Sequence, residues 1–306
     1  MLRFTALVKE TGFDPLTRFL VVGERRSNFV VLHDPDGADL EFDRNKLDVH
    51  EVTRERASRA ATALQDQFIT WGVAGEGSAK AFVGALVNTA SFGSQTRLLS
   101  VTGKVGGWAA ITAVRRGVKV DLSVAVLRQK VLTIAFKFVQ HLDKSGIMRP
   151  VTRWGPPDVR WLTTKLNWVY GPQANITFDV IEADWVKVNA FLGDPFGTKA
   201  FLAYLVQHKN KLADLNVFFV GNRWISDDGD AAGTHFYDHD ACVVVDNANL
   251  PFAPGADPFI VTLAHEVAHY LRGVQGHHKR PNVLLSDTLQ TTAVDKQLVL
   301  DINPPW

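Results

Sequence analysis

"AHEVAHYLRGVQGHHKRPNVLLS", residues 264–286, gathers four of the ten histidines of this 306-residue chain around a single glutamate. The overlapping stretch DPFIVTLAHEVAHYLRG (257–273) predicts a helix. Asp257 suits the N-cap, Pro258 the first helical position, and Gly273 the left-handed residue after the last turn. Apolar residues repeat along one face of this helix, which is therefore expected to pack on the core: Ile260, Leu263, Ala264, Val267, Ala268 and Leu271.

The other face of the helix carries the pattern His265-Glu266-x-x-His269. Residues four apart lie on neighbouring turns of one helix face, so the two imidazoles can bind one ion. Zn²⁺ accepts neutral histidine nitrogen in tetrahedral geometry, and a catalytic zinc lowers the pKa of a bound water to about 7. The carboxylate of Glu266 can lie beside that water and take its proton. The pattern predicts a catalytic zinc site with Glu266 as general base.

Here the sequence resembles the metzincin clan of zinc metallopeptidases, whose motif HExxHxxGxxH precedes a methionine turn. Arg272 and Gln275 occupy the glycine and third-histidine positions of that motif, so a spacer two residues longer would deliver His277 or His278. In the matrixin branch, the third histidine is followed four residues later by proline, a small residue, an apolar residue, leucine and methionine. Counted from His277, the same register gives PNVLL. The resemblance implies His277 as the third ligand, with His278 as the alternative, and Leu285 at the methionine position.

The methionine of that turn packs as an apolar floor beneath the metal in the family. The only methionines of this chain are Met1 and Met148. Leucine is close to methionine in size, so Leu285 is expected to take over the packing role.

The character of the chain changes near residue 128. Before it, short β-type runs alternate with turn residues, and RLLSVTGKVGGWAAITAVRRGVKVDLSVAVL (97–127) predicts three strands joined by two turns. Residues 53–72 have helical spacing and predict an insertion. The closing strands loosely resemble those of bacterial immunoglobulin-like domains. Residues 1–127 are therefore expected to form a small β-sandwich-like accessory domain.

Residues 128–306 predict one domain in which strands and helices alternate. The expected strands are 130–142, 174–183, 215–225 and 241–247, and the expected helices before the histidine helix are 156–171 and 198–212. This order is similar to that of the metzincin clan over roughly residues 128–290. The expected fold class is α+β, a metzincin-like catalytic domain with a twisted sheet. The resemblance implies an edge strand that pairs with an extended peptide substrate, formed by Cys242, Val243, Val244 and Val245.

Two weaker features lie just before that strand or within it. SDDGDAAGTHFYDHDAC (226–242) predicts either a second metal site, for Ca²⁺ or Zn²⁺, or a solvated acidic loop. The metal site would use His235, Asp238 and Asp240. Cys242 stands inside an apolar strand, which favours a buried, inert thiol over a thiolate that blocks the zinc.

Composition restricts the partners. A net charge of +1 gives no basic surface of the kind that nucleic acid requires, and one cysteine excludes an internal disulfide. Lys9, Glu10 and Asp14 interrupt the N-terminal region where a signal peptide would be apolar, and no stretch is long enough to span a membrane. The chain as given is expected to be soluble and without a leader, and export by a non-classical route is one option that stays open. The compartment and the oligomeric state stay open.

The leading interpretation is a zinc-dependent metalloendopeptidase acting on a peptide or protein. A second is a leaderless bacterial toxin or effector that uses the same chemistry on a host or cell-wall peptide, with an inhibitor or immunity protein as partner. A third is a non-catalytic metal-binding module on a degenerate metzincin fold. The glutamate at position 266 favours an enzyme, because a site that only binds metal needs no base.

Overall fold

The computed structural model describes residues 2–7, 12–34, 37–53, 96–189, 199–221, 224–226, 229–231, 233–236, 238–246, 258–273, 277, 284 and 293–305. The chain forms two compact units. The first unit comprises Met1–Lys130, Tyr170–Ile176 and Val294–Trp306, and the second comprises Val131–Val169 and Thr177–Ala293. The first boundary lies close to the change of character near residue 128, but two later segments also belong to the first unit.

The first unit contains two β-sheets. In sequence order its strands are β1 (Arg3–Ala6), β2 (Phe13–Asp14), β3 (Phe19–Gly23), β4 (Ser27–His33), β5 (Asp39–Phe42), β6 (Leu47–Glu51), β7 (Thr96–Gly103), β8 (Gly107–Arg115) and β9 (Val118–Leu127). One sheet has the order β1-β4-β7-β6 and the other β2-β3-β9-β8-β5. The three strands predicted over 97–127 are β7, β8 and β9.

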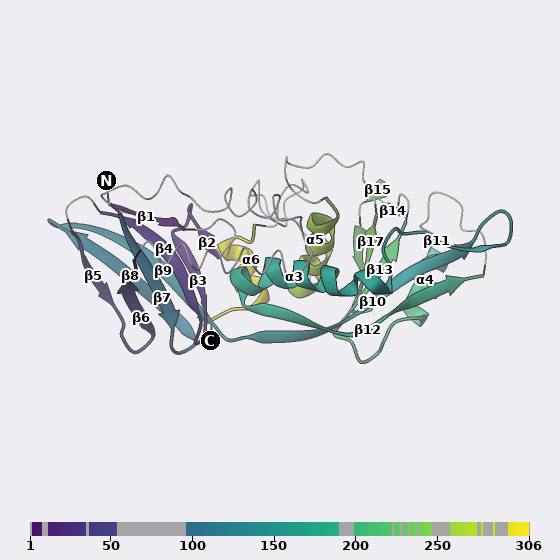
Figure 1. Cartoon of the computed structure of the whole chain (residues 1–306), viewed down its shortest axis with the longest axis horizontal. Coiled ribbons are helices and arrows are strands. Elements are labelled where there is room, and N and C mark those ends of the chain that lie inside the picture. Colours follow the sequence, from purple (N-terminus) through teal and green to yellow (C-terminus); the bar gives the residue numbers. More distant parts are fainter. Residues whose placement is uncertain are drawn as a thin grey trace. The chain divides into compact units, whose positions relative to one another are not determined.

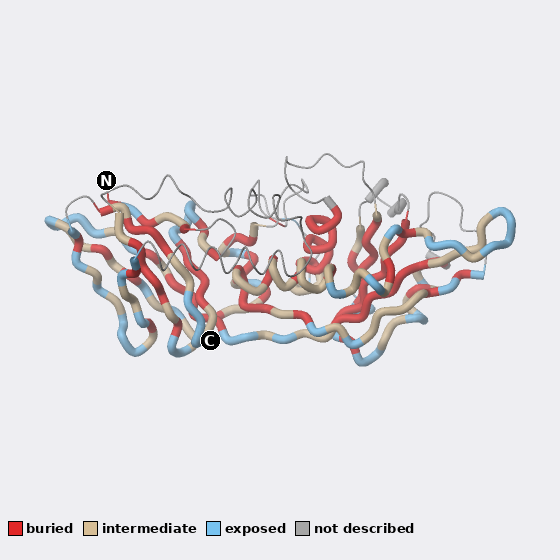
Figure 2. The backbone as a smooth tube through the Cα atoms, viewed as in Figure 1, coloured by how far each residue is buried: buried red, intermediate tan, exposed pale blue. Residues whose placement is uncertain are grey.

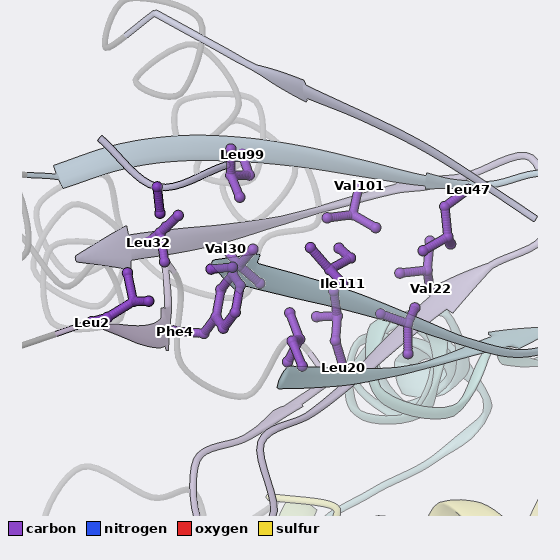
Figure 3. Packing of buried hydrophobic residues seen from close by; sticks show 14 of the residues in the cluster. Leu2, Phe4, Leu20, Val22, Val30, Leu32, Leu47, Leu99, Val101 and Ile111 are labelled. Carbon is purple, nitrogen blue, oxygen red and sulfur yellow. The ribbon is translucent and has the colours of Figure 1, made fainter. Parts of the chain in front are cut away.

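Apolar side chains from both sheets form one buried cluster, as the close view in Figure 3 shows for Leu20, Val30, Val101 and Ile111. Burial of this apolar surface holds the two sheets together. The sandwich-like arrangement expected for this region is therefore present. The predicted helical insertion lies outside the described residues, apart from Thr53.

The second unit is built on a mixed sheet with the order β11-β10-β13-β17-β16, and β12 also pairs with β10. Its strands are β10 (Lys130–Leu142), β11 (Met148–Pro150), β12 (Ile176–Val188), β13 (Leu215–Val220), β16 (Gly233–Phe236) and β17 (Ala241–Val245); β14 (Trp224–Ser226) and β15 (Gly229–Ala231) form a separate hairpin. β10, β13 and β17 run parallel, and β16 runs antiparallel to β17. Figure 1 shows these strands in sequence colours.

The described helices are α3 (Val159–Ala174), α4 (Lys199–Gln207), α5 (Pro258–Arg272) and α6 (Lys296–Ile302), and a short 3-10 turn, η2 (Pro156–Asp158), precedes α3. Together with the sheets they give the α+β class that the sequence predicts. Among the described residues, no helix has the length and apolar character needed to cross a membrane.

Both faces of the central strands of the second unit are covered. Every residue of β13 and β17 is buried, as the red tube in Figure 2 shows, and this explains their continuous runs of apolar residues. On one face, Phe201 and Leu205 of α4 pack in a cluster with Phe218 and Val243. α5 packs against β17 and β16, and Phe259 at its start contacts the ring of Phe219.

α5 is the helix predicted over 257–273, and it is buried from Phe259 to His269. Its end agrees with the prediction. Gly273 has φ 66°, and its N–H bonds to the carbonyl oxygens of His269 and Tyr270 at 3.0 and 3.1 Å. The capping role of Asp257 concerns a residue outside the described part of the chain.

Contrary to expectation, β17, which contains Cys242–Val245, does not lie at the edge of the sheet. It pairs with β13 on one side and with β16 on the other, so both rows of its backbone groups are used within the sheet. The hairpin that joins β16 to β17 adds one further strand. Within the described residues, the outer strand on this side of the sheet is therefore β16.

Candidate metal centre

The structure brings three histidines together. His265 and His269 lie one turn apart on α5, and His277 comes from the segment after the helix. The Nε2 atom of His265 lies 3.0 Å from that of His269 and 3.1 Å from that of His277. One ligand atom from each residue falls within 4.8 Å of the other two.

This spacing fits a single small cation. Three nitrogen ligands at ~2.0–2.1 Å in tetrahedral geometry lie about 3.3 Å from one another. The observed Nε2 separations of 3.0 and 3.1 Å are close to that value. Neutral imidazole nitrogens are also the donor type that zinc prefers. The residues present therefore fit a zinc ion.

A hydrogen bond orients the first of these histidines. The Nδ1–H of His265 donates to the carbonyl oxygen of Leu284 at 2.7 Å, so the lone pair of Nε2 points toward the other two histidines. Burial lowers the pKa of His265 to about 3, with a further lowering by His269. The ring is therefore neutral near pH 7, which is the form that binds a metal.

Glu266 lies next to the first ligand in sequence, and its side chain is buried with 5% relative exposure. Burial raises the pKa of its carboxyl to about 8, because the charged form loses its hydration. A carboxyl with this pKa exchanges its proton near neutral pH, as a general acid or base must.

The residues considered for a second metal are not assembled into a site. Asp238 and Asp240 are exposed in the turn between β16 and β17, whereas His235 is buried and its ring meets the ring of Tyr270 edge-on at 5.8 Å. Burial lowers the pKa of His235 to about 4, partly offset by Asp240. In the described part of the chain, the group able to hold a metal is His265, His269 and His277.

Cys242 is fully buried in β17. Burial and the nearby charge of Glu266 raise the pKa of its thiol well above the ordinary value. A protonated, enclosed thiol is a poor nucleophile and a poor metal ligand, which agrees with the expectation of an inert cysteine.

Three residues show which parts of the candidate site could be predicted from the sequence and which could not. His278 and Leu285 lie outside the described residues, so the alternative third ligand and the floor beneath the metal stay predictions. Leu284 was missed as a partner of the site, although it stands in the run PNVLL directly before Leu285. Leu284 contacts His265 through its backbone carbonyl. Such a contact does not depend on the type of residue, so the sequence gives no signal for it.

No protein-family model and no curated protein matches the chain. Among solved structures, the fold is similar to archaemetzincin from Methanopyrus kandleri, with 12% identity over 55% of this chain and 91% of that chain and a TM-score of 0.41. It is also similar to a zinc-dependent peptidase from Methanocorpusculum labreanum, with 12% identity over 56% of this chain and 100% of that chain and a TM-score of 0.38. The structural neighbours thus include zinc peptidases of low identity and partial coverage.

Proposed function

We propose that this protein is a zinc-dependent metalloendopeptidase. The observation that carries the proposal is the convergence of His265, His269 and His277, the first two of which lie on α5 together with the buried Glu266. Three neutral nitrogens and one acid–base group are the set that hydrolytic zinc sites use.

The three histidines would hold the zinc ion, and Leu284 would orient His265 through the hydrogen bond to Nδ1. When bound, zinc supplies a Lewis acid that makes water more acidic and polarises a carbonyl. Glu266 would take the proton of the attacking water and pass it to the leaving amine. The positive charge of a zinc ion held by the three histidines would lower the pKa of Glu266 from about 8 and so favour its ionised, basic form.

β16 is the best candidate for the strand that binds the substrate, in place of Cys242–Val245. It is an outer strand of the described sheet and packs against α5, which carries His265 and His269. An extended peptide can add to such a strand through backbone hydrogen bonds. This supports a peptide or protein as the substrate class.

Metal content and cleavage test the proposal together. We expect about one zinc per chain in the wild type and in Glu266→Gln, and little in His269→Ala. Of these three proteins, only the wild type should cleave a peptide library. His208→Ala, at an exposed histidine after α4, is the matched control and should keep both zinc and activity. Absence of zinc from reconstituted wild type would overturn the proposal.

The two other interpretations predict different results. A non-catalytic metal-binding module would retain zinc in the wild type and in Glu266→Gln, and neither protein would cleave any peptide. The burial of Glu266 argues against that reading. An enclosed carboxyl lowers the stability of the fold, and a module that only binds metal would have no use for it. A bacterial toxin or effector would share the site and differ in its target. Toxicity of the wild type, but not of Glu266→Gln, in an expressing cell would favour it.

A further inference from the structure

One face of β16 packs against α5. Successive side chains of a strand point to opposite faces, and Phe236 packs in the cluster on the α4 side of the sheet. Gly233 and His235 therefore face α5. His235 meets Tyr270, and Gly233 meets Glu266, which is one helical turn before Tyr270.

The contact at Gly233 leaves no room for a side chain. A Cβ atom there would lie 2.6 Å from Cγ and 2.7 Å from Oε1 of Glu266, both far inside van der Waals contact. It would also lie 2.7 Å from the carbonyl oxygen of Val243 in the neighbouring strand. Gly233 does not have a positive φ, so this position requires the small size of glycine and not its conformational freedom.

We propose that Gly233 is a positioning residue for Glu266. The bare backbone of β16 forms one wall of the niche that encloses the Glu266 side chain, and this wall selects the orientation of the carboxyl. Any larger residue would push Cγ and Oε1 away and turn the carboxyl to another rotamer. The inference rests on the proposed function for its catalytic meaning, because a base acts only within hydrogen-bond reach of the proton it takes.

Two structural reasons could require glycine at this position, and they make different predictions. If the glycine serves Glu266, the cost of Gly233→Ala depends on the side chain at position 266. If the glycine only lets β16 approach the Val243 carbonyl, the cost is the same whatever stands at position 266. A double-mutant cycle separates these two cases, because the contact with Val243 is present in both backgrounds and cancels.

The experiment measures thermal unfolding of metal-free wild type, Gly233→Ala, Glu266→Ala and the double variant. We expect Gly233→Ala to lower Tm by about 5 °C in the wild type, and by half of that or less when Glu266 is alanine. Thr234→Ala, whose side chain lies on the opposite face of the same strand, should show the same small shift in both backgrounds. Equal losses from Gly233→Ala in both backgrounds would overturn the inference.

Zinc content and kinetics then test the effect on the base. Gly233→Ala should keep its zinc, because the atoms nearest to the added Cβ belong to Glu266 and Val243, and should lower kcat about 10- to 100-fold with KM unchanged. A rise in KM alone, or a loss of zinc, would contradict a positioning role. If Gly233→Ala folds only in the Glu266→Ala background, the inference is supported; if it folds in neither, the inference fails. The unfolding cycle needs no activity, so it remains decisive even if the wild type cleaves nothing.

Discussion

The Nδ1 atom of His265 lies 2.7 Å from the carbonyl oxygen of Leu284, nineteen residues further along the chain. Leu284 is itself buried, and its N–H donates to the carbonyl oxygen of Ala293 at 2.7 Å. Leu284 is therefore joined by its backbone both to His265 on α5 and to Ala293. Such a bond fixes both the tautomer and the direction of the ring, so the candidate metal site depends on a residue that offers no side-chain ligand.

We expect Leu284→Ala to weaken zinc binding about 10-fold, because loss of the side chain loosens the backbone that orients His265. A zinc titration with a competing chelator measures the change. The matched control is Leu205→Ala, a fully buried leucine on α4 in the same unit. It should destabilise the fold by a similar ~2–5 kcal/mol and leave zinc affinity unchanged. Equal losses of zinc affinity in the two variants would assign the effect to general loosening of the fold.

The features of α5 could be predicted from the sequence, whereas the order of the strands around it could not. The ends of α5, its apolar face and the pair His265–His269 are set by residues close together in the chain, so periodicity and capping rules reach them. The order of β16 and β17 depends on which strands pair across the sheet, and residue spacing along the chain does not determine this. The sequence predicted an edge strand at Cys242–Val245, whereas in the structure one more strand, Gly233–Phe236, lies outside it. Contacts through backbone or through glycine leave no pattern, so Leu284 and Gly233 went unnoticed.

His235 should make the fold sensitive to acid. Burial lowers the pKa of its ring to about 4, from the ordinary 6.5. Between these values the unfolded chain binds a proton that the folded chain does not. The contribution of His235 to stability is thus present above pH 6.5 and is lost as the pH falls toward 4. In metal-free protein, His235→Phe should lose less stability than the wild type over this range, as followed by urea unfolding. His208→Ala, the exposed control, should track the wild type.

Lys137 is a buried cation on β10. Its Nζ lies 2.8 Å from Oε1 of Glu182 and 3.0 Å from Oδ1 of Asp184, and its side chain is 4% exposed. Burial alone would raise the pKa of Glu182, but hydrogen bonds from Lys137 and Asn210 hold it below the ordinary value. The ammonium group therefore favours the charged form of Glu182, whereas burial, together with the neighbouring Glu182, holds the pKa of Asp184 above its ordinary value.

We expect Lys137→Met to cost about 2 kcal/mol at pH 7, less than a fully buried pair because both carboxylates reach solvent. The loss should shrink at pH 4, where the carboxylates left behind can take up protons. Chemical denaturation at the two pH values measures it. Arg149→Ala removes the exposed pair between Arg149 and Asp143 and should cost less than about 1 kcal/mol. A loss from Lys137→Met that is independent of pH would contradict the ion-pair explanation.

The buried carboxyl of Glu266 should destabilise the metal-free protein in base. Its pKa is raised by burial to about 8, from the ordinary 4.5. Between these values the folded chain binds a proton that the unfolded chain lacks, so the contribution of this group to stability is present below pH 4.5 and is lost as the pH rises through 8. Glutamine at this position stays neutral, so chelated Glu266→Gln should melt about 5 °C above chelated wild type at pH 9 and converge with it near pH 5. If the Tm values of the two proteins instead changed in parallel from pH 5 to pH 9, Glu266 would be ionised without a cost in stability, and its niche would admit water.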